Sequence, residues 1–346
     1  GKYGGSELTQ DRSNNVLTAL KQEIGSRTFT LVNSAFYAKA KLLPGLSLDI
    51  NYNYIKKYNE GNSYTNPDRR QQTRFSDGTV STPAGASVGN ENLYTGFFNN
   101  NSNRQVLEGI LRYNKVIGEK HDIGAILGYN QTKHYEFNSS AKMKGLVDPS
   151  AWAPSAAIEK FEITGVDGDW STLSTFGRLT YTYDRRYTVE GSFRRDGSSK
   201  FAADSRYGFF PALSGAWNIA EEKFMENQNV FQSLKLRGSW GLLGSDNASG
   251  NYDYMSKYAA GDFVLGGMQN SGLRVTKIAN NSLQWETVRT RDIGLDAELL
   301  NRRLSLEIGV YDKYTTGILT TPSIYLTMGT AGAPTINGPE VTNKGI

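Results

Sequence analysis

The feature that most constrains the fold is a strict alternation of apolar and polar residues in short stretches of the chain. From Leu46 to Tyr54 the even positions are Leu, Leu, Ile, Tyr and Tyr, and the odd positions are Ser, Asp, Asn and Asn. This period of two predicts a β-strand with one apolar and one polar face. The pattern recurs in five further stretches, 122–130, 189–194, 234–242, 292–299 and 304–310. We therefore predict an all-β protein and exclude a helical bundle.

Composition narrows the class of protein. The 346 residues contain no Cys and two His, which excludes thiol nucleophiles, disulfides and Cys/His zinc sites. The net charge of +4 is small and the basic residues are scattered, so we expect no nucleic-acid partner. No stretch approaches the roughly 18 consecutive apolar residues of a membrane helix. A membrane β-barrel remains possible, because its alternating strands contain no such stretch.

The connections between the strands differ in length in a regular way. Four are short and polar and predict tight hairpins, at 44–45, 118–120, 184–186 and 301–303. The others are long and rich in Gly, Asn, Ser, Thr and Asp, at 59–103, 138–172, 196–205, 244–287 and 319–342. If neighbouring strands are antiparallel, the short turns lie at one end of the sheet and the long segments at the other, with a medium link at 220–233 on the short-turn end.

This sorting is typical of a transmembrane antiparallel β-barrel in an outer membrane, where periplasmic turns are short and extracellular loops are long. We count about ten strands of roughly 9 to 14 residues, a length that suits a tilted crossing of the membrane. Asn343-Lys344-Gly345-Ile346 reads as the start of a further strand. We therefore expect residues 1–346 to be one partial barrel domain from a larger protein.

Several motifs resemble one known family. They are Arg195-Asp196-Gly197-Ser198-Ser199-Lys200-Phe201, Ser205-Arg206-Tyr207-Gly208-Phe209-Phe210-Pro211, Leu234-Lys235-Leu236-Arg237-Gly238-Ser239-Trp240-Gly241, Asn281-Ser282-Leu283-Gln284-Trp285-Glu286 and Asn343-Lys344-Gly345. In this order and spacing they are similar to the SusC/RagA family of TonB-dependent outer-membrane transporters of Bacteroidetes. The resemblance is clearest from Leu173 onward, and the residues at 337–341 depart from the usual family sequence.

The resemblance implies a barrel of about 22 strands with an N-terminal plug and a segment gripped by the TonB-ExbB-ExbD system. It also implies a SusD-like surface lipoprotein that closes the extracellular mouth. We expect the plug, the TonB-gripped segment and the last strands to lie outside this chain. Location in the cell outer membrane, with contact to its lipid, follows from the same resemblance.

Charged residues of the polar strand faces are the first candidate site. Basic side chains cost about 2 to 4 kcal/mol against lipid at the membrane midplane, so we predict that the charged faces line the lumen. These residues are Asp49, Glu190, Lys235, Arg237, Asp292, Asp296, Glu298 and Glu307. We favour a hydrated wall or contact with a plug over direct contact with a substrate.

Aromatic residues of the long segments are the second candidate site, because their rings stack on ligands or pack against a partner. They are Tyr94, Phe97, Trp152, Trp170, Tyr252, Tyr254 and Tyr258. Packing within the loops is an equally good interpretation for each of them. Tyr and Phe near the strand ends, such as Tyr181, Tyr183 and Tyr187, fit the aromatic girdle of a membrane barrel.

We predict no catalytic, cofactor or metal site. Gly85-Ala86-Ser87-Val88-Gly89 matches a nucleophile-elbow pattern but lies in a Gly- and Thr-rich segment without a His and Asp nearby. Asp167-Gly168-Asp169 lacks the spacing of a calcium loop, so we interpret it as a solvated turn. Asp196-Gly197-Ser198-Ser199 predicts a tight turn in which the Asp side chain caps backbone amides.

The predicted function is import of an oligomeric nutrient, a glycan or a peptide, without chemical change. Two alternatives stay open: an outer-membrane barrel hydrolase, and a soluble all-β adhesin or binding module. The first requires a converged set of catalytic groups at the loop end. The second conflicts with the sorted connections. The sequence does not choose between a glycan and a peptide.

Overall fold

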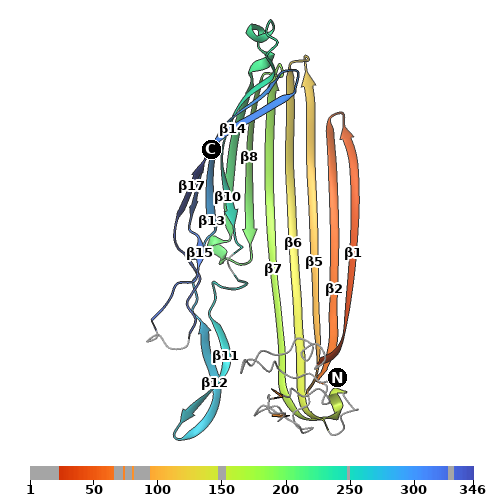
Figure 1. Cartoon of the computed structure of the whole chain (residues 1–346), viewed down its shortest axis with the longest axis vertical. Coiled ribbons are helices and arrows are strands. Elements are labelled where there is room, and N and C mark those ends of the chain that lie inside the picture. The colour runs from red at the N-terminus through yellow and green to blue at the C-terminus, as the bar shows by residue number, and fades with distance from the viewer. Residues whose placement is uncertain are drawn as a thin grey trace. The chain divides into compact units, whose positions relative to one another are not determined.

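The computed structural model describes residues 23–65, 73–74, 80–81, 94–146, 153–247, 250–325 and 331–346. Eleven strands form one sheet in the order β1-β2-β5-β6-β7-β8-β9-β10-β13-β14-β17 (Figure 1). Their bounds are β1 Glu23–Leu43, β2 Leu46–Thr65, β5 Tyr94–Ile117, β6 His121–Leu146, β7 Ala157–Tyr183, β8 Tyr187–Ser198, β9 Tyr207–Asn218, β10 Phe231–Ser245, β13 Glu286–Leu299, β14 Leu304–Thr316 and β17 Val341–Gly345. Strands adjacent in the chain are thus adjacent in the sheet, as in an up-and-down β protein.

Three small sheets and several 3₁₀ turns complete the described structure. The pairs are β3 Thr73–Arg74 with β4 Val80–Ser81, β11 Lys257–Leu265 with β12 Met268–Lys277, and β15 Leu319–Thr320 with β16 Ile336–Asn337. The 3₁₀ turns are η2 Pro154–Ala156, η3 Ala203–Ser205, η4 Ile219–Glu221 and η5 Lys223–Met225. No helix among the described residues is long and apolar enough to cross a membrane.

The chain divides into two compact units. One contains residues 1–34, 54–104 and 134–169, and the other contains residues 35–53, 105–133 and 170–346. All four short turns and the sheet from β8 to β17 belong to the second unit. The sites described below lie within that unit.

The short hairpin turns are confirmed. Pairs β1/β2, β5/β6, β7/β8 and β13/β14 are joined by two to four residues at the predicted positions. In the β7/β8 turn Asp184 and Arg185 have φ of 48° and 58°, and the Arg186 amide donates to the Tyr183 carbonyl at 2.9 Å. Consecutive residues with positive φ match the twist of the flanking strands, which favours a hairpin at this point.

The long segments are shorter than predicted, because the strands extend into them. β2 continues to Thr65, β5 begins at Tyr94, β6 continues to Leu146 and β7 begins at Ala157. Strands β1, β2, β5, β6 and β7 contain 21, 20, 24, 26 and 27 residues, instead of the expected 9 to 14 or so. Asp167-Gly168-Asp169 consequently lies in strand β7 and not in a turn. The motif at 85–89 lies outside the described residues.

The second unit has an apolar sheet face that other parts of the chain leave uncovered. Along β14 the even positions Leu306, Ile308 and Val310 are 46%, 58% and 55% exposed. Register places Ile308 opposite Leu295, and Leu295 opposite Leu236, on the neighbouring strands. A continuous row of exposed apolar side chains is costly in water and favourable against lipid.

Buried apolar packing in the second unit is concentrated where the loops meet. Phe201, Leu283 and Leu319 form a buried cluster, and Trp285 packs against it. The Trp285 indole donates to the Arg206 carbonyl at 3.2 Å, and its ring meets the Phe210 ring edge-on at 5.6 Å. These contacts tie the segments after β8, β12 and β14 to one another.

Aromatic side chains gather near the short-turn end. Tyr187 and Trp217 stack at 6.4 Å, and both donate a hydrogen bond to Glu222, the indole at 3.0 Å. These two bonds hold the pKa of Glu222 below its usual value, although burial raises it. His121 stacks on Tyr181 at 6.0 Å and lies 5.2 Å from the Tyr183 ring.

Candidate functional site

Strand register brings seven of the eight predicted charged residues onto one face of the sheet. Glu190 pairs with Ser214, Ser214 with Ser239, and Ser239 with Asp292, so this row crosses four strands. Lys235 pairs with Asp296, which pairs with Glu307. Paired residues and residues two apart share a face, which adds Arg237 and Glu298. We name this the polar face; its position in a lumen stays a prediction.

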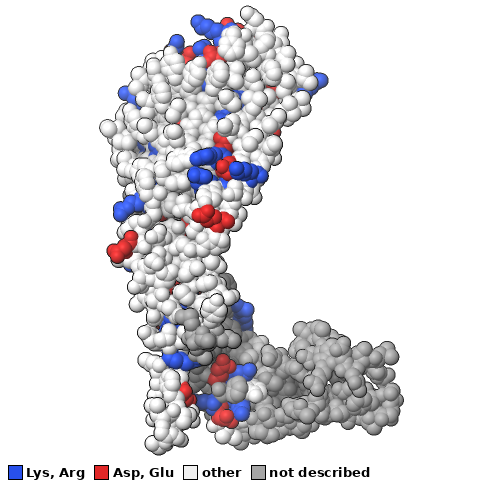
Figure 2. All heavy atoms as spheres, turned by 90° about the vertical axis from the view of Figure 1, so that its left-hand side faces the viewer, with Lys and Arg blue, Asp and Glu red and all other residues white. Residues whose placement is uncertain are grey.

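Arg237 is the centre of an ion-pair cluster on the polar face. Its Nη1 lies 2.9 Å from Asp292, its Nε lies 3.3 Å from Asp296 and its Nη2 lies 2.6 Å from Glu307. The planar guanidinium supplies separate donors in a fixed fork, so one side chain serves three carboxylates on two neighbouring strands. Figure 2 shows the same habit on the surface it displays, where basic and acidic side chains lie next to each other in small patches.

Asp49, the eighth predicted residue, has its own partners. It is buried in β2, with the Arg112 Nε 3.0 Å from one oxygen and the Lys39 Nζ 3.7 Å from the other. Arg112 belongs to β5 and Lys39 to β1. The carboxylate therefore connects three neighbouring strands.

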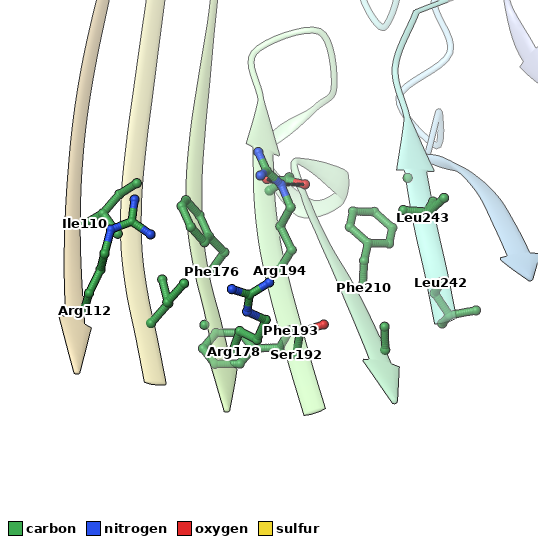
Figure 3. A pocket seen from close by; sticks show the side chains of 15 residues that line it. Ile110, Arg112, Phe176, Arg178, Ser192, Phe193, Arg194, Phe210, Leu242 and Leu243 are labelled. Carbon is green, nitrogen blue, oxygen red and sulfur yellow. Dashed lines mark hydrogen bonds and ion pairs between the residues drawn. The ribbon is translucent and has the colours of Figure 1, made fainter. Parts of the chain in front are cut away.

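A pocket of about 580 Å³ opens beside this ion pair (Figure 3). Arg112, Arg178 and Arg194 reach into it from β5, β7 and β8, and Phe176 and Phe210 form apolar walls. Sequence analysis did not name these three arginines as site residues. The signal was present, because Arg178 alternates with Leu179 and Arg194 with Phe193 in the same period of two.

Asp196 lines this pocket, and its predicted role is wrong. Its side chain does not cap backbone amides; both oxygens accept from the Arg194 Nε, at 2.7 and 2.8 Å. Strand β8 continues through this position to Ser198, so backbone hydrogen bonding is supplied by the sheet. A charged donor on the same face competes successfully for the carboxylate.

The long segment between β10 and β13 contains a second polar centre, at Asp253. This side chain is 5% exposed and accepts from the Lys257 Nζ at 2.9 Å, the Lys277 Nζ at 2.8 Å and the Gly250 amide at 2.9 Å. Thr335, from the segment after β14, donates to it at 2.9 Å. Burial raises the pKa of Asp253, but the donors outweigh burial and hold the pKa far below its usual value.

The predicted aromatic residues lie on several different elements. Tyr94 and Phe97 are in strand β5, Trp170 is in β7, and Tyr258 is in β11, so four of the expected loop residues are strand residues. Tyr252 and Tyr254 lie in the connection before β11. Tyr258 is 61% exposed, the most open of the exposed Tyr in this region. Trp152 lies outside the described residues.

Hairpin β11–β12, within the predicted long segment, was not predicted. It turns at Gly266 and Gly267, both with positive φ, between Leu265 and Met268. A Gly-Gly pair between two strand-like stretches is a hairpin signal, and it was readable in the sequence. Figure 1 shows the hairpin beyond the end of the sheet opposite the short turns of this unit.

Metal-binding groups were searched for in the part of the chain that the structure describes. Within that part, no three His, Cys, Asp or Glu side chains come together in a way that could hold a metal ion. Asp167 and Asp169 share strand β7 and do not form a calcium loop.

Comparisons with known proteins give a consistent result. The family model described as "TonB dependent receptor-like, beta-barrel" matches residues 2–346. TonB-dependent receptor P3 of Formosa agariphila is 28% identical over 330 residues, which cover 92% of this chain and 30% of that protein. TonB-dependent receptor SusC of Bacteroides thetaiotaomicron is 36% identical over 162 residues, covering 46% of this chain and 16% of SusC. The chain thus spans about a third or less of the relatives it matches.

A solved structure shares the fold. The structure titled "Structure of the RagAB peptide transporter" superposes with a TM-score of 0.81 at 22% identity, over 94% of this chain and 34% of that one. The family match and this superposition confirm the predicted all-β barrel fold and the resemblance drawn from the motifs.

Proposed function

The chain belongs to the TonB-dependent receptor-like β-barrel family, of the SusC/RagA type, and we propose that the full protein imports an oligomeric nutrient across the outer membrane. The two-faced sheet is the observation that carries this proposal. One face exposes rows of large apolar side chains, and the other carries paired charges and a pocket lined by arginines. A wall with these two faces separates lipid from a hydrated passage.

The mechanism proposed here has no chemical step. A ligand is captured at the mouth between the long loops and a SusD-like lipoprotein, and the TonB-ExbB-ExbD system then displaces a plug to open the passage. The relatives support this, since they are named as TonB-dependent receptors and a RagAB transporter. The cargo is an oligosaccharide or a peptide; the second is what the RagAB structure is titled for.

A loss of binding at the mouth tests the proposed function. Tyr258 is exposed on β11, where its ring is free to stack on a sugar face or a peptide side chain. In the full-length receptor, Tyr258→Ala is expected to weaken binding of an oligomer about threefold to tenfold. Titration with an oligosaccharide library and a tryptic peptide digest, followed by mass analysis of the recovered compounds, measures both claims.

The matched control is Tyr325→Ala, because Tyr325 is also highly exposed and lies in the segment after β14. Equal losses in the two variants would remove a specific role for Tyr258. A recovered compound of changed mass would replace the transporter proposal with the hydrolase alternative.

A further inference from the structure

The pocket on the polar face contains one arginine that its neighbours leave largely unused. Arg112 donates to Asp49, and Arg194 donates to Asp196 and, at 2.9 Å, to the Ser174 hydroxyl. Among the described residues, the contact found for the Arg178 guanidinium is an ion pair of 3.7 Å with Glu190. The same Glu190 oxygen already accepts from the Thr180 hydroxyl at 2.8 Å.

A guanidinium with unused donors selects a planar anion. Arg presents parallel N–H groups that match the two oxygens of a carboxylate, and this bidentate pair is stronger and more directional than a bond to a neutral group. Arg178 is also half exposed, so a ligand in the pocket reaches it without displacing a protein group. The chemistry of the pocket therefore favours a carboxylate over a neutral hydroxyl or amide.

The apolar walls define what accompanies the carboxylate. The Phe176 ring lies where a Cβ on Gly128 would stand, only 2.1 Å away, so Gly128 allows this ring to lie flat against β6. The Arg194 guanidinium lies 5.5 Å from the centre of the same ring. Phe210 stands on the other side of the pocket, as Figure 3 shows. A ligand with a flat or aliphatic body next to its carboxylate fits between these rings.

We propose that this pocket binds carboxylate groups of the cargo as it moves along the barrel wall, with Arg178 as the main anchor. This inference rests on the proposed import function and narrows its substrate class to acidic oligomers. A carboxylate of this kind comes from a uronic acid in a glycan or from an acidic side chain or C-terminus in a peptide. The pocket contributes recognition and no chemistry.

The test compares acidic and neutral probes on the purified full-length receptor. The probes are an oligogalacturonate and its carboxyl-reduced counterpart, and a Glu-containing peptide and its Gln counterpart, each titrated by calorimetry. Arg178→Gln is expected to weaken binding of the acidic probes by about tenfold or more, because a charge-assisted pair is lost, and to leave the neutral probes unchanged. Whichever acidic probe responds identifies the source of the carboxylate.

The matched control is Arg195→Gln. Arg195 lies on the next strand but on the opposite face, where its guanidinium covers the Tyr207 ring at 4.2 Å. Equal losses in both variants, or equal losses for acidic and neutral probes, would overturn the proposal. So would a change in protease sensitivity of the plug in Arg178→Gln with unchanged probe binding, since the pocket would then hold the receptor's own plug. Binding of neutral oligomers without preference for acidic ones overturns this inference alone, whereas no binding of any probe overturns the import function as well.

Discussion

Replacing Arg237 by Ala is expected to lower the amount of folded receptor in the outer membrane several-fold. The substitution removes three ion pairs at once, to Asp292, Asp296 and Glu307. Three carboxylates would then face one another across β13 and β14 without a counterion from β10. Removing one partner of a charge cluster costs more than the cluster contributes, because the remaining charges are left unpaired.

Lys235→Ala is the matched control for Arg237→Ala. Lys235 lies two residues earlier on β10, on the same face and opposite Asp296, and its removal deletes the same formal charge. No ion pair of Lys235 within 4.0 Å is found among the described residues. The measurement is the heat-modifiable receptor band in outer-membrane fractions. Equal yields of the two variants would show that the cluster does not stabilise the barrel.

A rescue experiment separates electrostatics from packing. Adding Asp292→Asn, Asp296→Asn and Glu307→Gln to Arg237→Ala removes the repulsion and keeps the shapes of the three side chains. We expect the yield to return most of the way to that of the native receptor. If the combined variant folds no better than Arg237→Ala, the stem of Arg237 and not its charge is what the sheet requires.

Replacing Asp253 by Ala is expected to release the loops that meet at this residue. Hydrogen exchange in residues 250–277 and 331–337 should accelerate at least about tenfold, because both Lys partners and Thr335 lose their acceptor. Exchange mass spectrometry on the full-length receptor measures the change. Asp262→Ala is the control, since Asp262 is an exposed carboxylate that bonds only within hairpin β11–β12, to Gln269 and Ser271, in the contacts described.

The pKa of Asp253 adds a pH prediction. A carboxyl whose folded pKa lies below its unfolded value of about 3.9 contributes stability above that value and loses it as the pH falls through the folded pKa. Protection of the loops should therefore be constant from neutral pH down to about pH 4. Loss of protection near pH 6 would contradict the assignment of this network to Asp253.

The sequence predicted the parts of the fold that depend on local pattern. Period-two alternation identified the strand faces of β2, β8, β10, β13 and β14, and polar turn residues located the four short hairpins. Strand length was not predictable in this way. Residues such as Asn99 to Asn103 are polar at every position, so a strand that continues beyond the membrane loses the alternation on which its detection depends.

The candidate site was predicted in composition but not in partnership. Charged side chains on one strand face were readable, and register later placed them together. That Arg237 would serve three carboxylates, or that Asp196 would accept from Arg194, depends on which strands are neighbours and on side-chain reach. Asp253 was not found because its partners lie up to 82 residues away in the chain.

The central claim is that the sheet is a membrane wall with lipid on one face and water on the other. The most direct test places a single Cys at each position from Leu304 to Val310 of the full-length receptor, with any native Cys replaced by Ser, and labels it with a fluorescent thiol reagent. These 346 residues contain no Cys to interfere. In lipid vesicles, a lipid-borne quencher should act on the even positions and a water-soluble quencher on Ser305, Glu307 and Gly309. Equal quenching of adjacent positions by either agent would contradict the account.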